Sequence, residues 1–85
     1  MPRVVFTSHL QRHVSCAEAE VPGATVGAAL DAVFRSQPQV RGYVLDEQGE
    51  LRKHIALFVG GRRARLADAV PAGAEIHVMQ ALTGG

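Results

Sequence analysis

The sequence predicts an α+β fold in which a mixed β-sheet packs on one main helix. Three observations lead there: strand-like stretches rich in β-branched residues near the N-terminus, one segment with a helical period, and further strand-like stretches in the second half. The expected order is β-β-α-β-β, with a short extra helical turn before the last strand. With 85 residues, the chain has the size of one domain spanning 1–85, and 82–85 are expected to form a flexible tail.

The first two strands are expected at residues 3–8 and 14–21, where β-branched and aromatic residues are frequent and apolar and polar residues alternate. The polar stretch HLQRH lies between them. Two such runs separated by about five residues are typical of a hairpin.

One segment has a clear helical period. Thr25 is the expected N-cap of a helix that begins at Val26, and Pro38 is expected to end it. Apolar residues at i, i+4, i+7 and i+8 form one stripe, and Asp31 and Arg35 lie on the opposite side. The stripe consists of Val26, Leu30, Val33 and Phe34.

The stretch after the helix is expected to form a strand, a turn at Gln48-Gly49 and a second strand that includes residues 54–59. In that strand Ile55, Leu57 and Val59 share one face. Gly60-Gly61 is expected to form the next turn.

Residues 65–70 are expected to make the short helical turn, and residues 75–82 the last strand. Alternation points one set of its side chains one way and the other set the opposite way. The first set is Ile76, Val78, Gln80 and Leu82; the second is His77, Met79 and Ala81.

The composition excludes several classes of protein. A formal net charge of +1 with 47% hydrophobic residues indicates an ordinary globular protein and gives no support to nucleic-acid binding. The single cysteine, Cys16, excludes an intramolecular disulfide and any multi-cysteine zinc or iron–sulfur site. No run approaches the roughly 18 apolar residues of a membrane span, and the N-terminus does not resemble a signal peptide. We therefore expect no membrane partner and a cytoplasmic location.

The side chains that precede the C-terminal tail include few candidates for catalysis or metal binding. The imidazoles are interpreted as ordinary polar side chains, Cys16 as a small buried residue, and Glu18 and Glu20 as solvated charges. No catalytic residue and no metal site is therefore expected. The basic turn at 60–63 is a plain tight turn or, alternatively, a contact for an acidic partner. The four histidines are His9, His13, His54 and His77.

The last two residues, Gly84 and Gly85, are the exception. Without Cβ atoms they can pass through a narrow channel and let another enzyme's backbone approach closely. A carboxylate there resists attack until activation as an acyl-adenylate supplies a leaving group, after which a sulfur nucleophile can take the acyl group. The pair also occurs by chance at a frayed terminus. The functional interpretation makes the chain a substrate of other enzymes.

Together these residues resemble the MoaD/ThiS sulfur carriers of the ubiquitin-like β-grasp superfamily. The resemblance rests on TVGAALDAVF in the helix, HIALFVGGR, PAGAEIHVMQALTGG at the end, and the terminal diglycine. It covers essentially the whole chain and implies a ubiquitin-like β-grasp fold.

The resemblance also implies roles for particular residues. Gly85 would be adenylated and converted to a thiocarboxylate, with Gly84 giving a slim approach, while Leu82 and Thr83 would enter partner enzymes as part of the tail. An apolar sheet surface would dock the activating enzyme. Phe58 and Met79 are the candidates for that surface, because they alternate away from the expected core residues.

The implied partners are a ubiquitin-activating-type adenylating enzyme, which uses ATP, and a downstream synthase that accepts the sulfur; no cofactor is bound. The acceptor pathway stays open among molybdopterin, thiamin, cysteine and specialised metabolites. Two other functions remain: a ubiquitin-like modifier joined to lysines, and a non-catalytic interaction domain. The ALTGG ending and the GYVLDEQGELRKH stretch differ from the commoner family patterns, which leaves the branch undecided.

Overall fold

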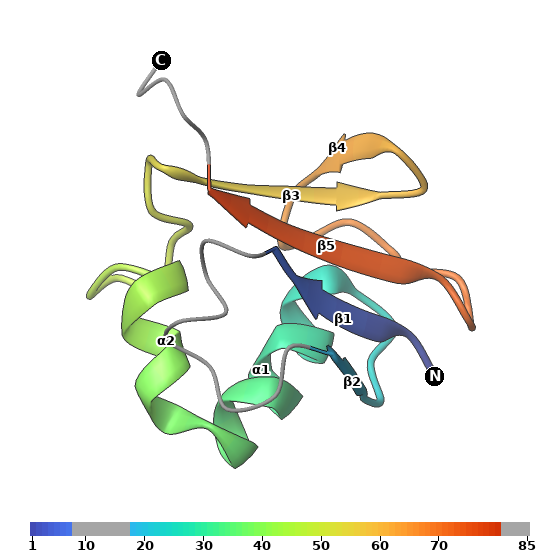
Figure 1. Cartoon of the computed structure of the whole chain (residues 1–85), viewed down its shortest axis with the longest axis horizontal. Helices are drawn as coiled ribbons and strands as arrows, with labels where there is room; N and C mark the ends of the chain where they lie inside the picture. Colours follow the sequence, from blue (N-terminus) through green and yellow to red (C-terminus); the bar gives the residue numbers. More distant parts are fainter. Residues whose placement is uncertain (8–17, 81–85) are drawn as a thin grey trace.

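The computed structural model describes residues 1–7 and 18–80 and has the expected α+β architecture. A five-stranded sheet has the strand order β2-β1-β5-β3-β4, and both helices lie on the same side of it (Figure 1). The elements are β1 (Arg3–Phe6), β2 (Glu18–Glu20), α1 (Val26–Ser36), α2 (Pro38–Val44), β3 (Ile55–Val59), β4 (Arg62–Ala64) and β5 (Glu75–Gln80).

The centre of the sheet is formed by the strands farthest apart in sequence. β1 pairs parallel to β5, with Val4 opposite Ile76, and β5 pairs antiparallel to β3, with Leu57 opposite Val78. A hydrogen bond from the Arg3 amide to the Ala74 carbonyl, at 2.9 Å, lies at the start of the β1–β5 pair. β5 is therefore paired on both sides from Ile76 to Val78, and its last two residues are paired with β3.

The predicted core is confirmed. The apolar stripe of α1 is buried, and it packs against the alternate residues of the three central strands. Asp31 and Arg35 lie exposed on the other side of α1. The buried strand residues are Val4, Phe6, Ile55, Leu57, Ile76 and Val78.

The predicted start of α1 is also confirmed. Thr25 is its N-cap, and its hydroxyl oxygen accepts a hydrogen bond from the Ala28 amide at 3.1 Å. This bond satisfies one of the amides that a helix leaves unpaired in its first turn.

The prediction for the stretch after α1 was wrong in part. Pro38 does not only end α1; it begins the second helix α2, at a position where its missing amide hydrogen costs nothing. The strand pairing expected next to Gln48-Gly49 is reduced to one bridge between Leu45 and Leu51, although the turn itself is present. A hydrogen bond from Arg52 Nε to the Gly42 carbonyl, at 2.7 Å, ties this turn to α2.

Two shorter stretches also differ from expectation. Residues 65–70 form a turn closed by hydrogen bonds between Arg65 and Asp68, and not a helical turn. β4 was not predicted, because RRA is too short to show alternation. The predicted strand residues 8 and 14–17 and the last two of 75–82 lie outside the described part, and the second strand is described at Glu18–Glu20 alone.

The loop before α1 passes very close to the helix at Gly23. A Cβ on Gly23 would lie 2.6 Å from the Ala29 nitrogen and 2.9 Å from its Cα, and the residue has a φ of +155°. We expect Gly23→Ala to lower the free energy of unfolding by about 1–3 kcal/mol, because backbone has to move. Gly42→Ala, in α2 with nothing within 4 Å, is the matched control and should raise it by roughly 0.5–1 kcal/mol. Urea unfolding of both variants measures this; equal effects would contradict it.

Within residues 1–7 and 18–80, neither helix has the length and apolar character needed to cross a membrane.

Candidate functional site

The predicted tail leaves the fold from its central strand. β5 ends at Gln80, directly opposite Ile55 at the start of β3. Residues 81–85, with Leu82, Thr83, Gly84 and Gly85, lie outside the described residues. What the structure does describe is the strand that leads into them, β5, which lies between β1 and β3 in the sheet and ends beside the start of β3 (Figure 1).

The side of the sheet away from the helices, here called the outer face, collects apolar side chains from the three central strands. Cross-strand pairing places Phe58 opposite His77, and Met79 opposite Ala56. Val5 is opposite His77 on its other side. The outer face is thus defined by Val5, Ala56, Phe58, His77 and Met79.

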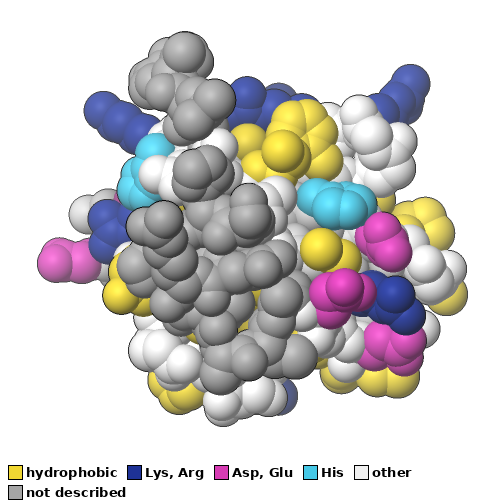
Figure 2. Space-filling model, in the orientation of Figure 1, with side chains coloured by type: hydrophobic (Ala, Val, Ile, Leu, Met, Phe, Trp, Pro, Cys, Tyr) yellow, Lys and Arg dark blue, Asp and Glu magenta, His cyan; other side chains and the backbone are white. Residues whose placement is uncertain are grey.

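Phe58 and Met79 are on the outer face, as the alternation predicted. Met79 is 38% exposed and Phe58 is half-buried, whereas the adjacent core residues Leu57 and Val78 are fully buried. Figure 2 shows apolar side chains and an imidazole next to each other over this part of the sheet. The two candidates are therefore close together and accessible to a partner.

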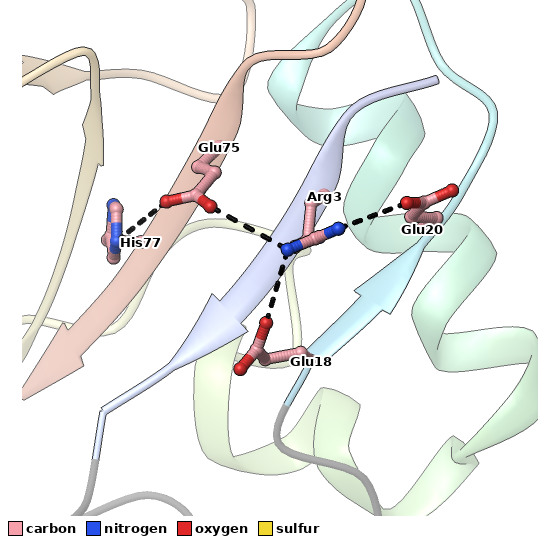
Figure 3. A network of polar contacts seen from close by, with 5 residues as sticks. All are labelled: Arg3, Glu18, Glu20, Glu75 and His77. Atoms are coloured by element: carbon pink, nitrogen blue, oxygen red, sulfur yellow. Dashed lines mark hydrogen bonds and ion pairs between the residues drawn. The ribbon is translucent and has the colours of Figure 1, made fainter.

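A group of charged residues borders the outer face at β1 and β2. Arg3 lies among three carboxylates, at 3.1 Å from Glu20, 3.6 Å from Glu18 and 3.9 Å from Glu75 (Figure 3). His77 Nε2 is 3.5 Å from a Glu75 oxygen. We call these five residues the Arg3 cluster.

The cluster keeps its central charge at any ordinary pH. The hydrogen bond that Arg3 donates to Glu20, with the negative charges of Glu20, Glu18 and Glu75, raises the pKa of the Arg3 guanidinium above its usual value. Among the described residues, this border thus brings one guanidinium together with three carboxylates.

The other singled-out residues do not converge on a site. His54 is exposed just before β3, and His77 is half-buried on the outer face. His9, His13 and Cys16 lie outside the described residues. Among the residues that the structure does describe, no group of three or more His, Cys, Asp or Glu side chains could hold a metal ion.

Sequence reasoning missed the Arg3 cluster and the contribution of Val5. Glu18 and Glu20 were interpreted as solvated charges, and nothing local indicated that Arg3 and Glu75 would lie beside them. The parallel β1–β5 register places Arg3 opposite Glu75, and the β1–β2 register places it opposite Glu20. A prediction that the first and last strands pair would have placed Arg3 beside Glu75 and so would have indicated the cluster.

Comparison with known proteins finds a relative by sequence and several by structure, and they agree with one another. No protein-family model matches the chain. Small archaeal modifier protein 1 of Haloferax volcanii is 39% identical over 62 residues, which cover 73% of this chain and 71% of the relative.

Solved structures superpose on essentially the whole length of this chain. A crystal structure of small archaeal modifier protein 1 from Haloferax volcanii superposes with a TM-score of 0.82 at 31% identity, covering 99% of this chain and 98% of that one. A chain of the Amycolatopsis orientalis BexX/CysO complex superposes with a TM-score of 0.84 at 22% identity, covering 100% of both chains, and this likeness concerns the fold. The resemblance seen in the sequence is thus confirmed, and the chain belongs to the MoaD/ThiS-like family of ubiquitin-like β-grasp sulfur carriers and protein modifiers.

Proposed function

We propose that this chain is a sulfur carrier whose Gly85 carboxylate is adenylated, converted to a thiocarboxylate and used as a sulfur donor in a biosynthetic reaction. The chain itself is then a substrate and not a catalyst. We place the cycle in the cytoplasm, where ATP is available for the activation.

The observation that carries the proposal is the position of β5. The strand that leads to the diglycine is hydrogen-bonded on both sides, to β1 and β3, and its core residues Ile76 and Val78 are fully buried. A reactive end attached to such a strand starts from a fixed point and direction. From Gln80 to Gly85 an extended chain reaches about 16 Å at ~3.3 Å per residue, which is enough to enter the active site of another enzyme.

The conversion of the Gly85 carboxylate to a thiocarboxylate proceeds in two steps. A Gly85 carboxylate oxygen attacks the α-phosphorus of ATP, so that pyrophosphate leaves and an acyl-adenylate forms. A hydrosulfide then attacks the acyl carbon, the carbon–sulfur bond forms and AMP leaves. The absence of a Cβ on Gly84 and Gly85 lets the enzyme's backbone surround the reacting carbon closely.

The partner in the first step is a ubiquitin-activating-type adenylating enzyme, and a sulfur-accepting synthase follows. We propose that the adenylating enzyme docks on the outer face, with Phe58 and Met79 as the apolar contacts. Three features support this docking: both side chains are accessible, Met79 lies on β5, which leads to the tail, and Phe58 lies on the adjacent strand β3. A structural neighbour is itself part of a complex, that of BexX and CysO.

The intact mass of the protein from its own cells, prepared without reducing agents, tests the proposal. We expect a fraction whose mass has increased by the replacement of one oxygen by sulfur, with fragmentation locating the change at Gly85. Incubation with ATP, sulfide and the adenylating enzyme of the same genome should increase that fraction, and omission of ATP is the control. An unchanged mass in all these samples would reject the sulfur carrier.

A second function uses the same activated end. The relative at 39% identity is named a modifier protein, which favours a role in which the Gly85 acyl group is joined to a lysine amine of a target. Peptides that carry a diglycine remnant on lysine would establish this role. The chain has one lysine, Lys53, so Lys53→Arg separates attachment to other proteins, which persists, from attachment to the side chain of a second copy, which is lost.

A further inference from the structure

The one lysine of the chain, Lys53, lies close to the end of the strand that leads to the diglycine. It is part of a tight turn that is closed by a hydrogen bond from the Ile55 amide to the Arg52 carbonyl, at 3.0 Å. Ile55 begins β3 and is directly opposite Gln80, the last residue of β5. The turn that carries Lys53 therefore adjoins the point at which β5 ends (Figure 1).

The chain between Gln80 and Gly85 is long enough for the terminal carbonyl to meet the Lys53 amine of the same molecule. Paired Cα atoms of an antiparallel sheet are at most about 5.5 Å apart and two residues span at most ~7 Å, so the Cα atoms of Lys53 and Gln80 lie within about 13 Å of each other. Residues 81–85 extend to about 16 Å, and a lysine side chain adds ~6 Å. Because Lys53 is exposed, its amine is open to an acyl group that arrives from this direction.

The other amine of the chain, at Met1, lies toward the opposite end of the sheet. β1 runs parallel to β5, and Arg3 is opposite Glu75, the first residue of β5. Gln80 is about 17 Å farther along that strand. Figure 1 shows the N-terminus and the end of β5 on opposite sides of the molecule. Lys53 is therefore the nearer of the two amines to the start of the tail.

An amine on the same molecule also has an advantage over the amines of other molecules. A short linker gives an effective concentration on the order of millimolar, well above that of a second copy present at micromolar concentration. A tail held extended in the channel of an enzyme keeps the acyl carbon of Gly85 away from Lys53. Capture by Lys53 therefore concerns an activated chain that has left the enzyme.

We propose that Lys53 captures an activated Gly85 of the same molecule and closes residues 53–85 into a ring through an amide bond. This inference rests on the proposed function, which supplies the Gly85 acyl-adenylate. The unprotonated Nζ of Lys53 attacks the acyl carbon, the carbon–nitrogen bond forms, AMP leaves with the electron pair of the carbon–oxygen bond, and a proton passes from the nitrogen to water. The closed chain has no free carboxylate, so it no longer carries sulfur and does not modify other proteins.

The test uses the full chain prepared with Gly85 as the thioester of a small thiol, which stands in for the acyl-adenylate and requires no adenylating enzyme. Intact mass follows the products at a low and a high protein concentration, and fragmentation locates any new amide bond. One variant is Lys53→Arg. The matched control combines Lys53→Arg with Arg35→Lys, which keeps the number of lysines and the net charge but moves the amine to the exposed side of α1.

We expect the wild-type thioester to give a product that is lighter than the free acid by one water, with the amide between Lys53 and Gly85. Its rate should be independent of protein concentration and about tenfold or more above the rate of amide formation in either variant. The two variants should give mainly the hydrolysed chain.

Three results would overturn the inference. They are a wild-type thioester that forms the internal amide no faster than Lys53→Arg, a ring closed at Met1 in place of Lys53, and equal ring closure by the relocated lysine at position 35. Each of them leaves the proposed function intact, because the thioester is made without the adenylating enzyme. Failure of that enzyme to adenylate the wild-type chain would instead reject the proposed function, whatever the thioester does.

Discussion

Removing Gly84 and Gly85 is expected to abolish thiocarboxylate formation completely while leaving the free energy of unfolding within about 0.5 kcal/mol of wild type. The chemistry is lost because a chain that ends at Thr83 carries its carboxylate on a branched residue two positions short of the reacting phosphate. Stability is retained because the buried residues of β5 end at Val78. Adenylation can be followed as pyrophosphate release with purified enzyme, and stability by urea unfolding.

A control variant keeps the length and the diglycine. Thr83→Ser alters a tail side chain without changing either glycine and should retain most of the activity. Gly84→Ala adds one methyl group to the tail. In a narrow channel this group should slow turnover without abolishing it. Full activity of the chain that lacks both glycines would mean that Gly85 is not the reacting residue.

Met79→Asp is expected to weaken binding of the adenylating enzyme by about 100-fold with the fold intact. The methionine is 38% exposed beside Phe58, so the substitution disturbs no fully buried residue, but it places a charge in the apolar part of the outer face. Burial of a charge without a partner in an interface costs several kcal/mol unless the complex rearranges. Equilibrium binding at saturating ATP measures the loss.

The matched control introduces the same charge elsewhere. Tyr43→Asp changes another exposed apolar residue, 43% accessible, on α2 and away from the outer face. Its affinity for the enzyme should remain within about threefold of wild type. Equal losses for Met79→Asp and Tyr43→Asp would place the docking surface somewhere other than the outer face.

How far the sequence predicted the fold depended on the length of each periodic segment. α1 carries four apolar residues at helical spacing and a capping threonine, so its start and its buried stripe were correct. α2 has seven residues with two buried valines, Val40 and Val44, and it begins at a proline, which was interpreted as a stop. In so short a helix, local sequence does not separate a proline that ends one helix from a proline that begins the next.

The candidate site, too, was predicted where its features are local in sequence and missed where they are not. The diglycine and the alternation of Phe58 and Met79 are local features, and the sequence sufficed to single them out. The Arg3 cluster depends on the first two strands and the last strand of the fold, and its members meet through the registers of β1 with β2 and β5. No local pattern encodes such a register, because it follows from how the two hydrophobic faces fit together in the core.

The parallel pairing of β1 with β5 also has a consequence during synthesis. Because β5 separates β1 from β3, a nascent chain that still has β5 inside the ribosome has an open gap in the middle of its sheet and an exposed core. Folding of this domain therefore waits until residue 80 has emerged, and interrupted products lacking β5 should be removed by cellular proteases. The strand that completes the domain is the one that leads to the diglycine, so a folded molecule is one whose tail has already been made.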